Sequence, residues 1–250
     1  MAELPKSLEE AIAQSREATQ AAIANGYTRI KVELVFPELK PMPVALQFIE
    51  AFEEMASELK VFFPDAGAAA LARRDWGQVP FKITDIGSSR ASVDEKIHPE
   101  DRVFLFVEPS AVEVLQVEKL CEAAGDRPVV LLNPNLEDAA IIGIGYAGRQ
   151  LRDRFLTTLE SSYYLRPLDG AAVLRCYPSP WQVWQETNDN YQLIAEVSTK
   201  PVGEELDNIL AGTTQAKDAA NPSNRSSDTA APKKPGLFTN LQRFIRTLSR

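Results

Sequence analysis

Residues 102–134, RVFLFVEPSAVEVLQVEKLCEAAGDRPVVLLNP, contain two apolar runs separated by a helical pattern. The runs, 102–109 and 128–134, are short and rich in valine, leucine and phenylalanine, as expected of strands buried on both faces of a parallel sheet. The helical pattern covers 110–124, and a helix is the usual crossover between two parallel strands. The stretch therefore predicts a strand–helix–strand unit and an α/β fold.

Similar patterns come before this unit. The first is a helix over Ser7–Ala24, with Ser7 and Glu10 in the spacing of a capping box and Gly26 just beyond its end. Strands alternating with helices are typical of a mostly parallel, Rossmann-like sheet with helices on both faces. Further apolar runs predict strands at 29–36, 59–64 and 81–86, and helical patterns between them cover 43–58 and 66–76.

The pattern changes after residue 160, where the segments become aromatic and β-branched. Asp169-Gly170 between two such segments is a strong hairpin signal, so we expect an antiparallel meander that extends the sheet. Trp181 and Trp184 either help this meander cover the core or form an aromatic surface for a partner or a pigment. A helix at 203–210 ends a single predicted domain over residues 1–210.

Polar residues stand next to prolines at the ends of several predicted strands. The carboxyl ends of parallel strands form the usual ligand crevice of an open α/β sheet. The same residues are also common in turns and helix caps, and we favour this second interpretation because the set is acidic and has no histidine. The set comprises Glu38, Lys40, Asp65, Asp85, Glu108, Asn133 and Asn135.

Residues 140–155, AIIGIGYAGRQLRDRF, contain Gly143, Gly145 and Gly148 in the dinucleotide-binding spacing G-x-G-x-x-G. That fingerprint needs a strand ending at the first glycine and a carboxylate at the end of a later parallel strand. The apolar run before Gly143 begins too soon after the preceding strand for a crossover helix, and Asp169 is expected in a hairpin turn. We therefore predict no dinucleotide site here.

What remains of this motif is a glycine loop leading into a helix with three arginines, Arg149, Arg152 and Arg154. Together with the helix N-terminus, Arg149 and Arg152 form a possible contact for a phosphate or a partner's carboxylate. The other interpretation is that these arginines make salt bridges to the acidic body of the protein.

The composition excludes several classes of site. The only histidine, His98, is expected in a turn, so metal sites and Ser-His-Asp catalysis have little to build on. The two cysteines, Cys121 and Cys176, lie in apolar segments and are expected to be buried structural thiols in a reducing compartment. We predict no catalytic residue, no metal and no cofactor, and neither a signal peptide nor a membrane span is expected.

The C-terminal residues differ in character from the rest of the chain. Residues 211–235 lack large apolar side chains and are expected to form a disordered linker, whereas 236–250 read as a basic amphipathic helix. The apolar stripe of that helix comprises Leu237, Phe238, Leu241, Phe244, Ile245 and Leu248. The basic residues of the same end are Lys233, Lys234, Arg243, Arg246 and Arg250.

The net charge of −8 conceals this contrast, because 22 basic and 35 acidic residues precede residue 233 and give that part −13. An acidic body is a poor partner for nucleic acid, so none is expected. The tail is predicted to bind a membrane surface or the groove of a partner protein. Docking of the tail on its own domain, and contact of the tail with nucleic acid, are less favoured alternatives.

Four stretches of the chain form a distinctive set: SLEEAIAQSREATQAAIANGYTRIKVELVFPELK, LLNPNLED, GIGYAGRQLRDRFLTTLESSYYLRPL and VLRCYPSPWQVWQE. They resemble an uncharacterised domain family of cyanobacteria and chloroplasts, and the resemblance covers roughly residues 4–210. Its plant members include a protein needed for photosystem II accumulation and the C-terminal part of a chloroplast adenylate kinase. No catalytic residue is established for the family, so none is carried over.

The resemblance implies a photosynthetic setting, and the lack of a transit peptide suits a cyanobacterium. The leading hypothesis is a non-enzymatic auxiliary factor for biogenesis of a photosynthetic complex, cytoplasmic and peripherally attached to the cytoplasmic face of the thylakoid by 236–250. The first alternative is a nucleotide- or phosphometabolite-binding enzyme or sensor that uses the strand-end crevice, with Arg149 and Arg152 as anion contacts. The second is a soluble module whose tail docks on one partner protein.

Overall fold

The computed structural model describes residues 3–88, 92–137, 145–187 and 190–219. Within these ranges the strands form one nine-stranded sheet in the order β3-β2-β4-β5-β1-β6-β7-β8-β9. The parallel strands are β1 (Arg29–Leu34), β2 (Leu59–Phe63), β3 (Lys82–Asp85), β4 (Val103–Val107), β5 (Val129–Leu132) and β6 (Glu160–Leu168). The antiparallel meander comprises β7 (Ala171–Cys176), β8 (Trp181–Thr187) and β9 (Asn190–Val197). The predicted mostly parallel sheet with an antiparallel extension is therefore confirmed.

The strand–helix–strand unit at 102–134 forms as predicted, with β4 and β5 paired in parallel. The helix between them, α4 (Val114–Ala124), begins later than the pattern at 110–124 suggests. Ser110 is the reason, because its hydroxyl donates to Glu113 Oε2 at 2.6 Å and accepts from the backbone N–H of Val112 at 3.2 Å. These bonds hold a turn, and the helix follows it.

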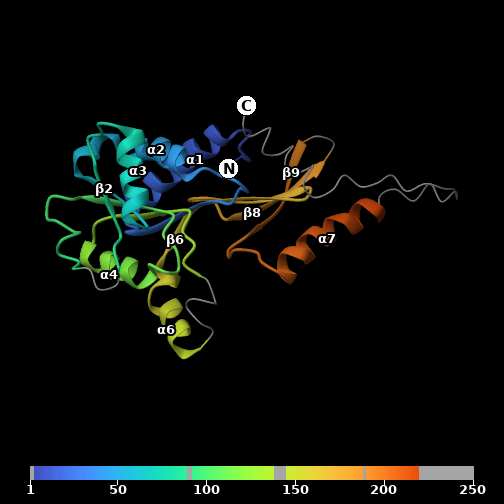
Figure 1. Cartoon of the computed structure of the whole chain (residues 1–250). Helices are drawn as coiled ribbons and strands as arrows, with labels where there is room; N and C mark the ends of the chain where they lie inside the picture. Colours follow the sequence, from blue (N-terminus) through green and yellow to red (C-terminus); the bar gives the residue numbers. More distant parts are fainter. Residues whose placement is uncertain (1–2, 89–91, 138–144, 188–189, 220–250) are drawn as a thin grey trace.

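One face of the sheet is covered by the first helices of the chain, α1 (Leu8–Ala24), α2 (Pro41–Phe48) and α3 (Ala66–Trp76) (Figure 1). Ser7 caps α1 by accepting from the backbone N–H of Glu10 at 3.1 Å, as predicted. The pattern at 43–58 is not one α-helix, because after Phe48 the chain tightens into the 3-10 helix η1 (Ile49–Glu58).

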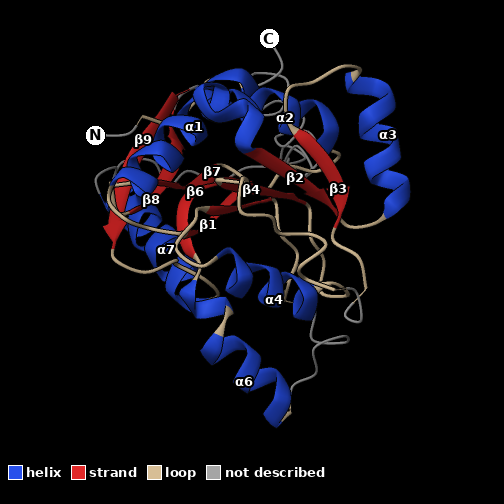
Figure 2. Ribbon diagram, turned by 90° about the vertical axis from the view of Figure 1, so that its left-hand side faces the viewer, coloured by secondary structure: helices blue, strands red, loops and turns tan. Residues whose placement is uncertain are grey.

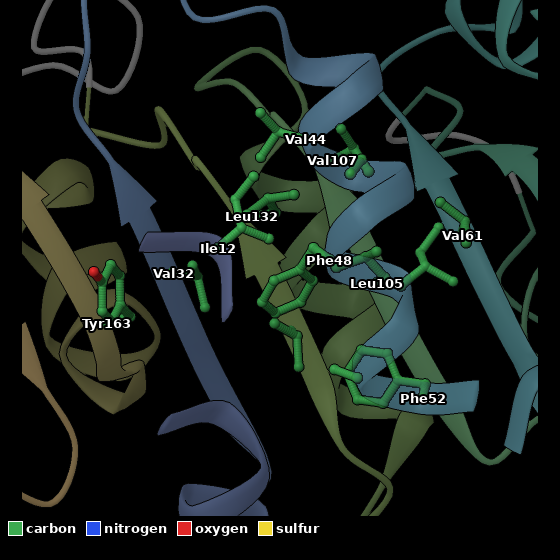
Figure 3. Packing of buried hydrophobic residues seen from close by; sticks show 14 of the residues in the cluster. Ile12, Val32, Val44, Phe48, Phe52, Val61, Leu105, Val107, Leu132 and Tyr163 are labelled. Atoms are coloured by element: carbon green, nitrogen blue, oxygen red, sulfur yellow. The ribbon is translucent and has the colours of Figure 1, made fainter. Parts of the chain in front are cut away.

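The core on this face is built from helix and strand side chains that interdigitate. Figure 3 shows Ile12 of α1 and Phe48 of α2 over the row of strand residues that includes Val32 of β1, Leu105 of β4 and Leu132 of β5. All five side chains are buried, so this face of the parallel sheet is sealed from solvent.

The opposite face carries α4, α6 (Tyr146–Arg154), the short 3-10 helix η2 (Leu156–Thr158) and α7 (Glu204–Ala219) (Figure 2). Helices therefore lie on both faces, as expected. Two separate apolar clusters form here, one beneath α4 and α6 and one between the meander and α7. Helix α7 continues past residue 210 to Ala219, so its helical part includes the beginning of the segment for which a linker was expected.

The meander begins at the predicted hairpin, in which Asp169-Gly170 joins β6 to β7 and Gly170 has a φ of +66°. Strand β6 pairs with β7 on one side and in parallel with β1 on the other, so it joins the two parts of the sheet. Trp181 is buried against α7 residues, and Trp184 packs against the core on the α1 face. Both tryptophans therefore serve the core.

Candidate functional site

The residues predicted to bind a membrane or partner, Lys233 to Arg250, lie outside the described residues. Gly143 of the glycine motif does too, whereas Gly145 precedes the first residue of α6 and Gly148 is buried within that helix. Strand β5 ends at Leu132, well before Gly143, so the first glycine does not end a described strand. Residues 138–144 lie outside the described part of the chain, so the expectation that no dinucleotide site forms here stays a prediction.

Backbone strain gathers at the carboxyl ends of the central strands. Glu108 after β4 and Asn133 after β5 both have a φ of +49°, and Glu38 after β1 has a φ of +61°. Such left-handed conformations are uncommon in residues other than glycine and often occur at functional sites. The two turns also pair with each other, because the backbone N–H of Asn135 donates to the carbonyl of Pro109 at 2.8 Å.

Glu108 and Asn133 differ in what their side chains contact. Asn133 has a structural role, since its Oδ1 accepts from the backbone N–H of Leu34 at 2.6 Å and so ties β5 to β1. The Glu108 carboxylate has no hydrogen-bond or ionic partner in the described part of the chain, and burial raises its pKa. A partly buried, unpaired carboxylate with a raised pKa is typical of ligand-binding and proton-transferring groups.

The other rim residues mostly support the turn and cap interpretation. Asp65 caps α3 by accepting from the backbone N–H of Ala68 at 2.9 Å. Asp85 accepts from Lys96 Nζ at 2.9 Å; burial alone would raise the pKa of this carboxyl, but the bond to Lys96 lowers it overall. Glu38 and Lys40 are exposed. Of the seven predicted rim residues, Glu108 is therefore the best candidate for direct contact with a ligand.

Helix α6 projects from the sheet face that also carries α4 and α7 (Figure 1). Its inner side holds Gly148 and Leu151, both buried, while Tyr146 and Arg149 are exposed. Arg154 makes the predicted kind of salt bridge to the body, with Nε 2.5 Å from Glu118 Oε1 and Nη2 2.8 Å from Oε2.

Arg149 and Arg152 differ from Arg154 in having no ionic partner among the described residues. They lie three positions apart, on the same side of α6, and Arg149 belongs to its first turn. The arrangement leaves both guanidinium groups available for an anion, which agrees with the contact proposed from the sequence without testing it.

A second polar group was not foreseen from the sequence. Lys31 and Glu33 of β1 lie 3.4 Å apart, and Lys200, in the loop between β9 and α7, lies 3.6 Å from Glu33. The signal was the strict alternation in RIKVEL, residues 29–34, which predicts one polar face on a strand. Residues 29–36 as a whole are apolar enough to predict a strand, and that pattern does not single out these side chains.

The cysteines fit their expected structural role. Cys121 is buried, and burial raises the pKa of its thiol to about 12. Cys176 is half-buried, with its thiol pKa raised to about 11 by the same cause. Both thiols are therefore protonated and poorly nucleophilic at neutral pH.

Within the described ranges, two kinds of feature are absent. No helix there is both long and apolar enough to cross a membrane. No group of three or more histidine, cysteine, aspartate or glutamate side chains is placed there to hold a metal ion.

The amino-acid sequence matches the model of a known protein family. Residues 5–208 match a family model described as a domain of unknown function, DUF1995. The match begins before α1 and ends within α7, so it includes every strand of the described sheet. The chain therefore belongs to the DUF1995 family.

Proposed function

We propose that this chain is a non-enzymatic auxiliary factor in the biogenesis of a photosynthetic complex, with photosystem II as the first candidate. Residues 236–250 would attach it to the cytoplasmic face of the thylakoid membrane. The observation that carries the proposal is the amphipathic pattern of 236–250, which places six large apolar residues on one side and Arg243, Arg246 and Arg250 on the other. The photosynthetic setting rests on the resemblance to plant and cyanobacterial relatives.

The charge distribution supports a reversible attachment. The body carries −13 and would be repelled by anionic lipid, while residues 233–250 carry +5 and no acidic residue. Each basic residue near an anionic surface contributes about 1 kcal/mol, and the apolar stripe adds to this. Attachment should therefore weaken at high salt, because screening reduces the electrostatic part.

The described domain offers a surface suited to a client protein. Val112, in the turn before α4, and Leu115, at the start of α4, are exposed, as is Tyr146 at the start of α6. Exposed apolar and aromatic side chains are typical of protein interfaces, and so are arginines such as Arg149 and Arg152. In this proposal the tail holds the chain at the membrane and this surface meets the client.

Flotation with phosphatidylglycerol-rich vesicles tests the attachment. The full chain should float, and a chain lacking 236–250 should not. Leu241→Asp/Phe244→Asp should abolish flotation, and Arg243→Glu/Arg246→Glu should reduce it most at low salt. Arg102→Glu, an exposed charge reversal on the domain, serves as the matched control and should float normally. Unchanged flotation after deletion of 236–250 would rule out the anchor.

Co-purification from thylakoids tests the client. The full chain should enrich subunits of one photosynthetic complex, and the tail deletion should enrich them less. An Arg149→Glu/Arg152→Glu chain, with its tail intact, should remain on the membrane but lose the client. Enrichment of unrelated soluble proteins by every variant would contradict a role in complex biogenesis.

The second candidate is a nucleotide- or phosphometabolite-binding enzyme or sensor. The strained Glu108 turn, with its unpaired carboxylate, is the observation that favours it. A thermal-shift screen of nucleotides, with Arg149→Ala as the control, distinguishes this function from the first. Stabilisation of the original chain but not of Arg149→Ala would favour the sensor, and no stabilisation by any nucleotide would count against it.

A further inference from the structure

Strand β1 has one charged face although it lies inside the sheet, between β5 and β6. Ile30, Val32 and Leu34 are buried in the core on the α1 face, so the intervening Arg29, Lys31 and Glu33 face the other way. Inner strands of parallel sheets are usually apolar on both faces. The charged face therefore needs an explanation.

Arg29 has a structural explanation. Its guanidinium donates to four backbone carbonyls, two of which belong to the last turn and the C-cap of α4. It thus neutralises the negative end of that helix. Lys31 and Glu33 have no comparable role, and they lie nearer the carboxyl end of the strand.

One carboxylate is shared between two ammonium groups at this point. Glu33 lies 3.4 Å from Lys31 Nζ and 3.6 Å from Lys200 Nζ. Their side chains are 16%, 22% and 34% exposed, in that order, so the trio is largely removed from water. Burial lowers the pKa of Lys200, and the nearby positive charge of Lys31 lowers it further. The carboxylate of Glu33 raises this pKa but does not outweigh burial. The trio has a surplus positive charge in a half-buried place.

Lys200 is fixed in position by two aromatic rings. Its Nζ lies 3.9 Å from the ring centroid of Tyr164 and 5.8 Å from that of Trp181. Such cation–π contacts hold an ammonium group without satisfying its hydrogen bonds. Lys200 can therefore still donate to a ligand.

Neighbouring strands add polar atoms that have no hydrogen-bond partner in the described structure. They are Ser161 Oγ on β6, Arg175 Nε on β7 and Glu33 Oε2 on β1. Glu33 Oε2 is the atom that lies 3.4 Å from Lys31 Nζ, and the Arg175 guanidinium binds Glu160 Oε1 through Nη2 at 3.0 Å, which leaves its Nε free. Ser161 is only 8% exposed. Lys31 is the register partner of Ser161, and Tyr164 pairs with both Glu33 and Arg175, so these side chains share one contiguous region of the sheet. Buried polar atoms are rarely left unpaired, and each such case suggests a missing partner.

We call Lys31, Glu33, Ser161, Arg175 and Lys200 the polar strip. It follows β1, β6 and β7 between the two helix groups of this face. Figure 2 shows α4 on one side of β1 and β6 and α7 on the other, and Figure 1 gives the same order. The partial exposure of Lys31 and Lys200 agrees with a region that the helices do not fully cover.

We propose that the polar strip binds a phosphate group that keeps at least one P–OH proton. The two ammonium groups and the Ser161 hydroxyl would donate to phosphate oxygens, and Arg175 Nε would add a charge-assisted bond. Glu33 Oε2 is an acceptor, so it would receive the proton of the P–OH group. An oxyanion without a hydroxyl group, such as sulfate, leaves Glu33 facing a second anion. The inference is independent of the membrane tail and of Arg149 and Arg152.

Titration calorimetry on the full chain, with inorganic phosphate and sulfate at pH 6.5 and constant ionic strength, tests this site. Phosphate should bind saturably and sulfate about tenfold more weakly, because one charge-assisted hydrogen bond is lost. Glycerol phosphate distinguishes the sources of the group: tighter binding than inorganic phosphate indicates a phosphorylated metabolite, and weaker binding indicates the free ion. Either result supports the site.

Variants locate the binding. Lys31→Met and Lys200→Met should each weaken phosphate binding about tenfold, and Ser161→Ala should weaken it severalfold with little effect on folding. Glu33→Gln should remove the preference for phosphate over sulfate, because an amide can donate to either ion. A strip that serves only to hold the fold together would not change ion preference in this way.

Matched controls separate the strip from other cations. Lys6→Met removes an exposed lysine of the same domain, Arg149→Ala/Arg152→Ala removes the α6 cations, and Arg243→Ala/Arg246→Ala removes tail cations. All three should bind phosphate like the original chain. Absence of saturable phosphate binding, or binding that survives Lys31→Met/Lys200→Met, would overturn the proposal.

Discussion

The Nζ of Lys60 lies 3.2 Å from Oδ2 of Asp101, and both side chains are buried at the amino ends of β2 and β4. Asp101 also accepts from Lys82 Nζ of β3 at 2.7 Å and from the backbone N–H of His98 at 3.1 Å. One carboxylate thus joins three neighbouring strands and the loop that leads into β4. Glu100, which is exposed, shares Lys82 at 2.9 Å.

Asp101→Asn should lower the free energy of unfolding by about 3 kcal/mol, because removing one partner leaves a buried ammonium group uncompensated. Urea denaturation followed by tryptophan fluorescence measures the change. Lys60→Met/Asp101→Asn should be more stable than Asp101→Asn alone, since the unpaired charge is gone. If the second substitution adds further destabilisation instead, the buried ammonium is not the source of the loss.

Stability should also fall in acid through this carboxylate. Burial by itself would raise the pKa of Asp101, but the bonds from Lys82, His98 and Lys60 outweigh it and hold the pKa below the ordinary value. A carboxyl with a lowered folded-state pKa stabilises the fold above its unfolded pKa, about 3.9, and loses that contribution as pH falls through the folded value.

Unfolding free energies measured between pH 6 and pH 2.5 test this. The original chain should lose stability steeply below about pH 4, and Asp101→Asn should show a shallower slope there. The Lys60 ammonium group is common to both proteins, and burial lowers its pKa despite the opposing bond to Asp101. Parallel slopes for the two proteins would mean that other carboxylates dominate acid unfolding.

Glu108→Gln should make the protein slightly more stable at pH 7.5, by at most about 1 kcal/mol given the partial solvation of this carboxylate. Burial raises the pKa of Glu108, so its charged form costs stability above the folded pKa and this cost disappears below the unfolded value, about 4.3. Thermal unfolding should therefore show a higher Tm for the variant at pH 7.5 and equal values near pH 4.

Glu113→Gln is the matched control for this prediction. Its carboxylate accepts from the backbone N–H and the hydroxyl of Ser110, at 3.0 and 2.6 Å, and so holds the turn before α4. This substitution should lower the Tm at pH 7.5. A Tm decrease of equal size in Glu108→Gln would show that Glu108 is itself a structural residue.

The strand–helix alternation could be predicted from the sequence because inner parallel strands are apolar on both faces. Val103–Val107 and Val129–Leu132 are entirely buried, and they stand out as short apolar runs. Strand order could not be predicted in the same way. The insertion of β1 between β5 and β6 depends on packing between segments more than 90 residues apart, which no local pattern encodes.

The candidate sites show a similar division. Asp65 could be recognised as a cap because capping depends on residues three positions apart. The trio of Lys31, Glu33 and Lys200 could not be foreseen as a unit, because Lys200 comes from a loop about 170 residues further along the chain. The local alternation in residues 29–34 indicates Lys31 and Glu33, but it carries no information about Lys200. The tail prediction concerns residues beyond the described part and stays a prediction.

Helix α6 should loosen when its bond to α4 is removed. Arg154 contacts Glu118 through both Nε and Nη2, and beyond this pair the helix packs through Leu151 and the adjoining Phe155. Arg154→Met should therefore speed amide exchange across residues 149–155 about fivefold and leave exchange in β4 and β5 unchanged. Hydrogen–deuterium exchange with mass spectrometry resolves the two regions.

Arg152→Met is the matched control, because it removes a cation without an ionic partner in the described structure. Its helix α6 should exchange like that of the original chain. Equal exchange in all three proteins would show that apolar packing alone holds α6, whereas faster exchange in β4 and β5 would mean that Arg154 supports the whole sheet.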